Sequence, residues 1–222
     1  MSYQLGQYAI KGLLTKTGID PKEVGYVVMG TVIANVKTGN VARESAITAG
    51  IPDNAPCHTV TMACISANQA IVSAMHIINN GDADVVIAGG TDSVSDAPIM
   101  FNKVMRKKLF KAQKLKGVGD ILKFVSTLRP ADFVPDAPAV AEFLTGRTMG
   151  LDCDILAARY GVTRNEQDEF AVRSHQLAAK ADAEGILAAE ITPVETAPKF
   201  KRIAKDNGFR GDTTLEKMSK LK

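Results

Sequence analysis

Short β-branched segments alternate with helical segments through the first 98 residues, and this alternation constrains the fold more than any other feature. The expected strands are rich in valine, isoleucine and threonine, whereas the expected helices carry apolar residues at helical spacing and end close to a glycine. We expect strands at residues 24–33, 58–62 and 84–90, and helices at residues 3–16, 41–51 and 65–78. Strands and helices in this order predict an α/β layered sheet.

Two of these segments carry an expectation about burial. Residues 84–90, DVVIAGG, form a continuous apolar run, which is typical of a strand buried on both faces of a sheet. Helix 65–78 presents a single apolar stripe, which is typical of a helix that packs through one side. The stripe consists of Ala67, Ala70, Ile71, Ala74, Met75 and Ile78.

The character of the chain changes after Pro98. Between Lys103 and Arg129 there are nine Lys or Arg residues and one acidic residue, Asp120, interleaved with apolar residues. One interpretation is a solvated basic helix, because charge runs usually form solvated faces. The alternative is a surface that meets anionic lipid or the phosphates of a ligand.

A further helix is expected in the last third of the chain. Thr163 and Glu166 have the spacing of a capping box, in which each residue satisfies a backbone N–H at the start of the helix. Apolar residues follow at helical spacing, and Gly185 is the expected stop.

Composition excludes several classes of function. The net charge of +3 over 222 residues gives no global basic field, so we expect no nucleic-acid partner. Three cysteines without a C-x-x-C pair fit neither a disulfide framework nor a zinc site, and they indicate a reducing compartment. The N-terminus MSYQLGQYAIKGLL lacks leader features, and no apolar run reaches about 18 residues, so we expect no targeting or membrane-spanning segment.

Cys64, in the stretch TMACISANQA, is the residue with the clearest chemical potential. It lies between an expected strand and the first turn of an expected helix, where unpaired N–H groups and the helix dipole favour a thiolate. Its own backbone N–H could also donate to an oxyanion formed on an acyl group attached to the sulfur. The alternative is a buried structural cysteine, the commoner fate of a lone thiol. Cys57 and Cys153 have no helix start beside them and are interpreted as structural.

None of the three histidines is placed by sequence as a base for Cys64. His58 opens the strand that leads to Cys64, and a rise of about 3.3 Å per residue carries it out of reach of the sulfur. His76 lies about three turns along the following helix, and His175 lies in the capping-box helix. We expect all three to be surface or edge residues.

Three long segments, in order, resemble the N-terminal half of the thiolase family. They are HTVTMACISANQA, DVVIAGGTDSVSDAP and TMGLDCDILAARYGVTRNEQDEFAVRSHQLAAKADAEGILAAEI. The segment CISANQA and the basic insertion after GGTDSVS are most similar to one subtype of thiolase. This subtype is the mitochondrial thiolase of fatty-acid β-oxidation that works with a hydratase/dehydrogenase subunit. The resemblance covers essentially the whole chain.

The resemblance implies roles for individual residues. Cys64 would be the acyl-thioester nucleophile that attacks the 3-keto carbon of a 3-ketoacyl-CoA, with its backbone N–H directed at the oxyanion. Met149 would line the acyl pocket, and Arg210 would lie near the adenine and phosphates of coenzyme A. Coenzyme A would be a co-substrate, and no cofactor would be bound permanently. Arg43 matches a segment near the family's dimer interface.

The resemblance also implies a fold and a domain organisation. The fold class is α/β, a thiolase-like layered fold that holds the N-terminal half of the core, with an inserted, mainly helical loop domain. Residues 1–98 would form the core half without its first strand, and residues 99–222 would form the loop domain with the basic insertion 103–129.

The second half of the family carries a His-Glu-Ala-Phe-like or Asn-Glu-Ala-Phe-like segment, a Gly-His-Pro histidine and a Cys-x-Gly cysteine. None of these motifs occurs in the 222 residues. The hypothesis at this stage is a truncated and inactive thiolase part without the C-terminal domain.

Two other classes of function stay open on the sequence alone. One is another condensing enzyme of the same fold, such as a ketoacyl synthase. The other is a non-catalytic partner of a full-length thiolase or of a hydratase/dehydrogenase subunit. The expected partners are 3-ketoacyl-CoA and CoA, a second copy in a homodimer, the hydratase/dehydrogenase subunit, and a membrane surface met by residues 103–129. The resemblance implies a mitochondrial location.

Overall fold

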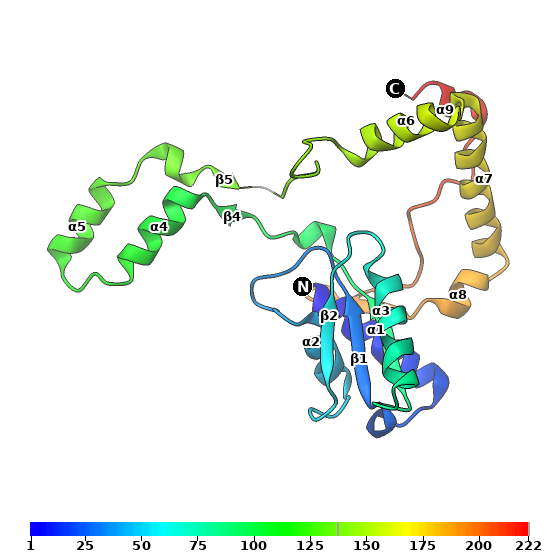
Figure 1. Cartoon of the computed structure of the whole chain (residues 1–222), viewed down its shortest axis with the longest axis horizontal. Helices are drawn as coiled ribbons and strands as arrows, with labels where there is room; N and C mark the ends of the chain where they lie inside the picture. Colours follow the sequence, from blue (N-terminus) through cyan, green and yellow to red (C-terminus); the bar gives the residue numbers. More distant parts are fainter. Residues whose placement is uncertain (137, 222) are drawn as a thin grey trace. The chain divides into compact units, whose positions relative to one another are not determined.

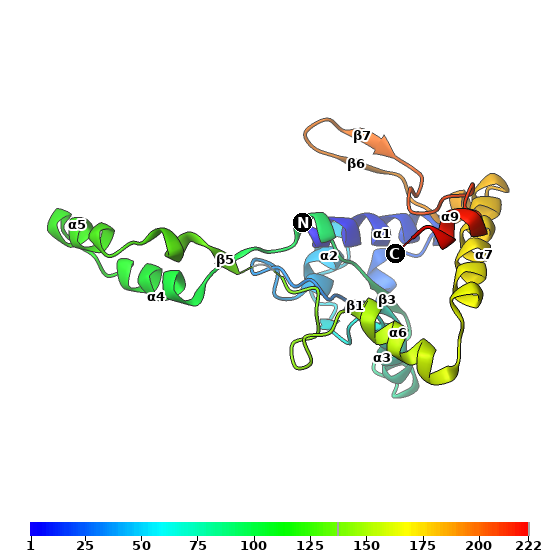
Figure 2. The same ribbon diagram turned by 90° about the horizontal axis from the view of Figure 1, so that it is seen from above.

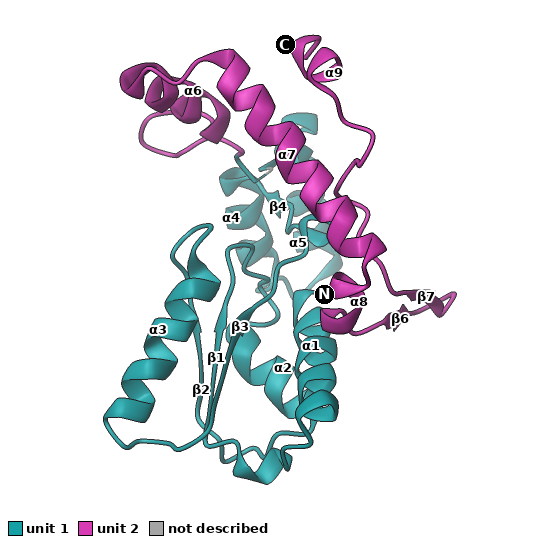
Figure 3. Ribbon diagram, turned by 90° about the vertical axis from the view of Figure 1, so that its right-hand side faces the viewer, with its two compact units in different colours: residues 1–139 teal, residues 140–222 magenta. Residues whose placement is uncertain are grey.

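A computed structural model describes residues 1–136 and 138–221. The chain divides into two compact units, residues 1–139 and residues 140–222 (Figure 3). The boundary expected after residue 98 is a different one: it separates the core half of the family from its loop domain. That boundary stays a prediction.

The first unit is built on a three-stranded parallel sheet (Figure 1). Its strands are β1 (Tyr26–Gly30), β2 (Cys57–Val60) and β3 (Val86–Gly90), in the order β2-β1-β3. Each strand is shorter than its expected range. The strands extend only as far as their residues pair with the neighbouring strand. The expected α/β sheet is confirmed.

Three helices cover the sheet, α3 (Ser66–Asn79) on one face and α1 (Ser2–Thr17) with α2 (Val41–Ala49) on the other (Figure 3). Short 3-10 turns follow α1 (η1, Pro21–Glu23) and β3 (η2, Val94–Asp96). The buried apolar residues that form the core between the sheet and α1 and α2 are Ile10, Val24, Val27, Met29, Val41, Ala42, Ala46, Ala49, Ile51 and Ile87.

The expectation that residues 84–90 are buried on both faces is wrong. Only Ile87 of β3 is buried, because β3 is an edge strand and the central position belongs to β1. Val27 and Val28 of β1 are fully buried and point to opposite faces. A central strand, rather than the most apolar one, is therefore the strand covered on both sides.

The apolar stripe of α3 is only partly covered in this chain. Ala70 and Ala74 are buried, whereas Ile71, Met75 and Ile78 are about half exposed, at 50%, 56% and 47%. Small residues therefore carry the contact between α3 and the sheet, and the larger apolar side chains face outward.

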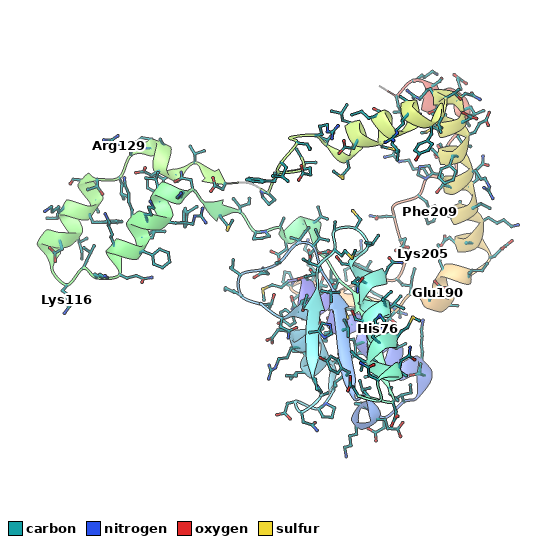
Figure 4. All side chains as sticks on the ribbon, in the orientation of Figure 1. His76, Lys116, Arg129, Glu190, Lys205 and Phe209 are labelled. Carbon is teal, nitrogen blue, oxygen red and sulfur yellow. The ribbon has the colours of Figure 1, made fainter. Side chains whose placement is uncertain are left out.

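The basic insertion of the first unit is a helical hairpin closed by a two-stranded antiparallel ladder (Figure 1). Its elements are β4 (Met100–Phe101), α4 (Lys103–Ala112), α5 (Val118–Ser126), η3 (Pro130–Phe133) and β5 (Pro135–Asp136). Figure 4 shows Lys116 at the turn between the helices and Arg129 at the opposite end of α5. Asp132 is buried at this end, where its carboxylate pairs with Lys108 and accepts from the Arg129 N–H at 2.8 Å.

The second unit is mainly helical and carries a β-ribbon, which Figure 2 shows as an open hairpin. Its elements are α6 (Met149–Tyr160), α7 (Arg164–Ala183), α8 (Ile186–Glu190), β6 (Val194–Thr196), β7 (Lys201–Ile203) and α9 (Leu215–Ser219). The expected capping box is confirmed: the Glu166 N–H donates to Thr163 Oγ1 at 3.3 Å, and the Thr163 N–H donates to Glu166 Oε2 at 2.7 Å. No helix within residues 1–136 and 138–221 has the length and apolar character needed to cross a membrane.

Candidate active site

Cys64 lies in a tight turn between β2 and α3, one residue before Ile65, the N-cap of α3. Ala63 adopts a left-handed conformation with φ of 48°, which is uncommon for a residue with a Cβ. The Ile65 N–H donates to the Met62 carbonyl at 3.3 Å, and the Ser66 N–H donates to the Ala63 carbonyl at 3.2 Å. The thiol therefore lies between β2 and the first turn of α3, where the sequence had placed it.

Ser66 fixes this turn from the inside. Its hydroxyl accepts from the Met62 N–H at 2.8 Å and donates to the Ala63 carbonyl at 2.6 Å, and the residue is buried. A single side chain thus ties both residues that precede Cys64 to the start of α3.

Two glycines allow α3 to begin directly on the carboxyl ends of β1 and β3. A Cβ on Gly30 would lie 2.5 Å from the Ser66 carbonyl carbon and 2.7 Å from the Ala67 nitrogen. A Cβ on Gly90 would lie 3.1 Å from the Ala67 Cβ. Only a residue without a side chain permits so close an approach of strand and helix at Gly30.

Cys64 lines an open pocket of about 480 Å³ at this end of the sheet. The residues around the pocket are Gly30, Val32, Ile33, Ala63, Cys64, Ser66, Ala67, Gly90, Thr91, Asp92 and Val94. Cys64 is exposed, so the alternative interpretation as a buried structural cysteine is wrong. The lining is mostly apolar, which suits an acyl chain better than a polar ligand.

The backbone around Cys64 offers hydrogen-bond donors. Within residues 1–136 and 138–221, no acceptor engages the Cys64 N–H in hydrogen-bond geometry. Unpaired N–H groups at a helix start carry partial positive charge, which favours an anionic oxygen or sulfur nearby.

Asp92 is a residue of the pocket that sequence reasoning missed. Its carboxylate accepts from the Thr31 hydroxyl at 2.9 Å, from the Val32 N–H at 3.0 Å and from the Ile33 N–H at 2.7 Å. It lies two residues after the end of β3, and a polar residue near the carboxyl end of a strand, close to the end of the neighbouring strand, was the available signal. Asp92 therefore joins the two loops that border the Cys64 pocket.

The histidines lie away from this pocket. His58 is on the edge strand β2, where its Nδ1 lies 3.2 Å from the Tyr26 hydroxyl and its ring stacks edge-on against Tyr26. His76 is exposed on α3 (Figure 4). In the part of the chain that the structure describes, no histidine lines the pocket of Cys64.

The other two cysteines differ from Cys64 in their surroundings. Cys57 is half-buried, and its thiol donates to the Ala55 carbonyl at 3.3 Å. Burial raises the pKa of the Cys57 thiol, and the positive charge of Arg43 opposes that rise. Cys153 is exposed on α6. Neither residue lines the Cys64 pocket.

Arg210 lines a separate pocket of about 460 Å³ within the second unit. The residues around it are His175, Gly208, Arg210, Asp212, Thr213, Lys217, Met218 and Leu221. His175 is half-buried, and its Nδ1 accepts from the Arg210 N–H at 3.2 Å, so this histidine is held by a contact that the sequence had not indicated. A hydrogen bond from Lys217 lowers the pKa of Asp212, and the charge of Lys217 adds to this effect.

The charges in this pocket favour an anionic group. Lys217 is paired with Asp212, whereas the Arg210 side chain is exposed and has no ion-pair partner among the residues that the structure describes. The charge of Arg210 also helps to lower the pKa of Asp212, but its guanidinium forms no direct ion pair there and is suited to bind phosphate.

Met149 is the first residue of α6 and is exposed, at 56%. Met149 and Arg210 belong to the second unit, whereas Cys64 belongs to the first. A joint site of these three residues stays a prediction.

Comparison with known proteins agrees with this geometry. The family described as "Thiolase, N-terminal domain" matches residues 1–222. The β subunit of the mitochondrial trifunctional enzyme of Macaca fascicularis is 47% identical over 100% of this chain and 46% of its own length. A 3-ketoacyl-CoA thiolase of Pectobacterium carotovorum is 39% identical over 99% of this chain and 50% of its own length.

A solved structure gives the same result in three dimensions. The acetyl-CoA acetyltransferase of Bacillus anthracis superposes with a TM-score of 0.79 at 29% identity, over 100% of this chain and 52% of that one. The chain spans about half the length of the curated relatives it matches. The resemblance on which the fold expectation rested is confirmed, and the chain belongs to the thiolase family, whose N-terminal domain it carries.

Proposed function

We propose that this chain provides the acyl-acceptor cysteine of a 3-ketoacyl-CoA thiolase, an acyl-CoA:acetyl-CoA C-acyltransferase of fatty-acid β-oxidation. The observation that carries the proposal is the exposed Cys64 at the start of α3, in an apolar pocket beside an N–H group open to an oxyanion. Relatives named as 3-ketoacyl-CoA thiolases and trifunctional enzyme β subunits support the same substrate class.

The proposed step is a covalent transfer. The Cys64 thiolate attacks the 3-keto carbon of a 3-ketoacyl-CoA, and the bond between carbons 2 and 3 breaks. Its electron pair leaves with carbon 2 of the departing acetyl-CoA, which takes up a proton. The acyl group stays on Cys64 as a thioester until the thiol of a second CoA attacks it and restores the cysteine. The Cys64 N–H would stabilise the oxyanion of each addition.

Coenzyme A is the proposed co-substrate, and no permanently bound cofactor is part of the proposal. The Arg210 pocket would bind the adenine and phosphate end of CoA, since it presents an unpaired guanidinium. Met149 would contact the acyl chain.

Mass spectrometry of the Cys64 peptide tests the proposal. After incubation with a 3-ketoacyl-CoA or acetyl-CoA, the peptide should gain the mass of the acyl group, and hydroxylamine should remove it. Cys64→Ser should abolish the labile adduct, whereas Cys153→Ser is the matched control and should leave it unchanged. Absence of any thioester, together with co-purification of an intact thiolase or hydratase/dehydrogenase subunit, would instead favour a non-catalytic partner.

A second function, contact with an anionic membrane surface, is favoured by the α4–α5 hairpin. Both helices expose large apolar side chains beside their lysines: Val104, Leu109, Phe110, Val118, Ile121, Leu122 and Val125. Phe110 and Leu122 are exposed at 69% and 67%. Helices with an apolar face and a lysine-rich face bind in the interface of anionic bilayers.

Vesicle co-sedimentation tests this second function. The chain should bind vesicles of phosphatidylserine and phosphatidylcholine more than vesicles of phosphatidylcholine alone, and less as salt increases. Phe110→Ser with Leu122→Ser should reduce binding about tenfold, because each removes an exposed apolar anchor. Phe143→Ser is the control, since Phe143 is 94% exposed in the second unit. Equal binding by all three proteins would exclude the membrane, and loss of binding to a hydratase/dehydrogenase subunit in the double variant would then assign the hairpin to that partner.

The proposal includes a homodimer, assembly with a hydratase/dehydrogenase subunit and a mitochondrial location. The location and the assembly rest on relatives named as β subunits of a mitochondrial trifunctional enzyme, and the homodimer rests on the resemblance to the family.

A further inference from the structure

We infer that Asp92 is a positioning residue that holds Val32 and Ile33 as one wall of the Cys64 pocket, and thereby determines how well an alkyl chain lies beside the sulfur. The identity of that chain as an acyl group rests on the proposed function. The positioning itself rests on the hydrogen bonds of Asp92.

The loop after β1 is held by Asp92 at consecutive positions. The carboxylate accepts from the Thr31 hydroxyl and from the backbone N–H groups of Val32 and Ile33, at 2.7 to 3.0 Å for Oδ1. The Val32 N–H also lies 3.1 Å from Oδ2. Three donors on one carboxylate fix the direction in which the Val32 and Ile33 side chains leave the chain.

The two ends of this contact are anchored by the sheet. Thr31 donates its N–H to the Val60 carbonyl at 3.1 Å, and Thr91, beside Asp92, donates its N–H to the Gly30 carbonyl at 3.0 Å. Apart from the Asp92 carboxylate, no acceptor within residues 1–136 and 138–221 binds the Val32 or Ile33 N–H. The position of these two residues therefore depends on the Asp92 side chain.

The residues held in this way supply apolar surface to the pocket. Val32 is 50% exposed and Ile33 is half-buried, and both line the pocket together with Val94 and Cys64. Without the carboxylate, the N–H groups would bind water and the loop would leave its place. Because Asp92 itself is accessible to solvent, its removal should alter the loop more than the folding of the unit.

Thiol labelling with N-alkylmaleimides tests the inference on the whole chain. Rates of Cys64 labelling are measured by mass spectrometry for N-methyl to N-octyl reagents and divided by the rates of Cys153, an exposed cysteine of the same molecule. In the wild type this ratio should rise about tenfold from methyl to octyl, the effect of burying roughly two methylene groups.

Three variants then separate the position of the Val32–Ile33 wall from the stability of the first unit. Asp92→Ala should reduce the rise to less than about twofold and leave the methyl ratio unchanged. Asp92→Asn should retain most of the rise, because an amide keeps the Oδ1 acceptor. Asp84→Ala is the matched control: Asp84 is exposed before β3, at the opposite end of the strand. It should behave as the wild type does.

A flat ratio in the wild type, or an unchanged rise in Asp92→Ala, would overturn the inference. If Asp92→Ala does not fold, amide hydrogen exchange of the wild type decides: Val32 and Ile33 should be protected, and free exchange at both would overturn the inference. If the labelling ratio rises with chain length in an Asp92-dependent way but no thioester forms on Cys64, the positioning role is supported and the proposed function is contradicted. If a thioester forms on Cys64 but the labelling ratio does not depend on Asp92, only the positioning role is contradicted.

Discussion

Gly30 and Gly90 are register partners on the neighbouring parallel strands β1 and β3, and the first turn of α3 lies directly against both. This pair determines where the turn that carries Cys64 can be placed. The backbone of Ser66 and Ala67 occupies the space that a side chain at Gly30 would need. The candidate site thus depends on two residues that have no chemistry of their own.

Gly30→Ala should destabilise the first unit by about 1–3 kcal/mol, because the added methyl group overpacks the contact between β1 and α3. Thermal unfolding measures the loss, and labelling of Cys64 should change with it. Gly39→Ala is the control, since no heavy atom lies within 4 Å of a Cβ at that position. Equal melting temperatures for the two variants would show that α3 moves without cost.

Acid should loosen the α4–α5 hairpin. The hydrogen bond from Lys108 is the main cause that holds the pKa of Asp132 below its usual value, followed by the hydrogen bond from the Arg129 N–H. A carboxyl whose pKa is lower in the folded state stabilises that state above its unfolded pKa, and the contribution is lost as the pH falls through the folded pKa. Hydrogen exchange within residues 103–134 should therefore accelerate below about pH 4.

Asp132→Asn should reproduce this loosening at neutral pH, visible as faster tryptic cleavage at Lys116. Asp136→Asn, which removes an exposed ion pair with Arg106 in the same insertion, is the control and should have little effect. Unchanged cleavage in Asp132→Asn would mean that the hairpin is held by its other contacts.

Arg164→Gln should release α9 from α7. Arg164 Nη2 donates to the carbonyls of Met218 at 2.8 Å and Leu221 at 3.1 Å, while its Nε donates to the buried Asp168 at 2.8 Å. Because the Arg164 side chain is half exposed, the expected loss is about 1 kcal/mol, seen as faster hydrogen exchange in residues 214–221. Arg173→Gln on the same helix should leave that exchange unchanged.

Arg210→Gln should weaken CoA binding about tenfold, the effect of losing one charge-assisted contact to phosphate. Isothermal titration with CoA measures the change, and the difference between variant and wild type should shrink as salt increases. Arg159→Gln on α6 removes an exposed arginine outside the pocket and is the control. The same affinity in Arg210→Gln would remove this pocket from the proposed site.

The order of elements in the first unit could be predicted because the spacing of apolar residues within each segment indicates a helix or a strand. The helices at residues 2–17, 41–49 and 66–79 match their expected segments to within two residues at each end, β1 and β3 lie within theirs, and β2 begins one residue early, at Cys57. The capping box at Thr163 is equally local, since its residues are three apart. Burial of β3 could not be predicted, because strand order decides which apolar strand is central.

The site shows the same division. Position in the sequence and the family resemblance identified Cys64, but local pattern left its exposure open. Asp92 and Thr31 are 61 positions apart in the chain, and only the parallel pairing of β1 with β3 brings the carboxylate to the loop after β1. The contact between His175 and Arg210 spans 35 positions and was not predicted for the same reason.

By itself, the sequence determined the elements, the family and the cysteine, because spacing, caps and long ordered motifs act over short distances along the chain. The tertiary structure decided which strand is central, how closely α3 approaches Gly30, and that Asp92 holds the wall of the Cys64 pocket. These features depend on contacts between residues far apart in the chain, and such contacts exist only once the sheet has formed.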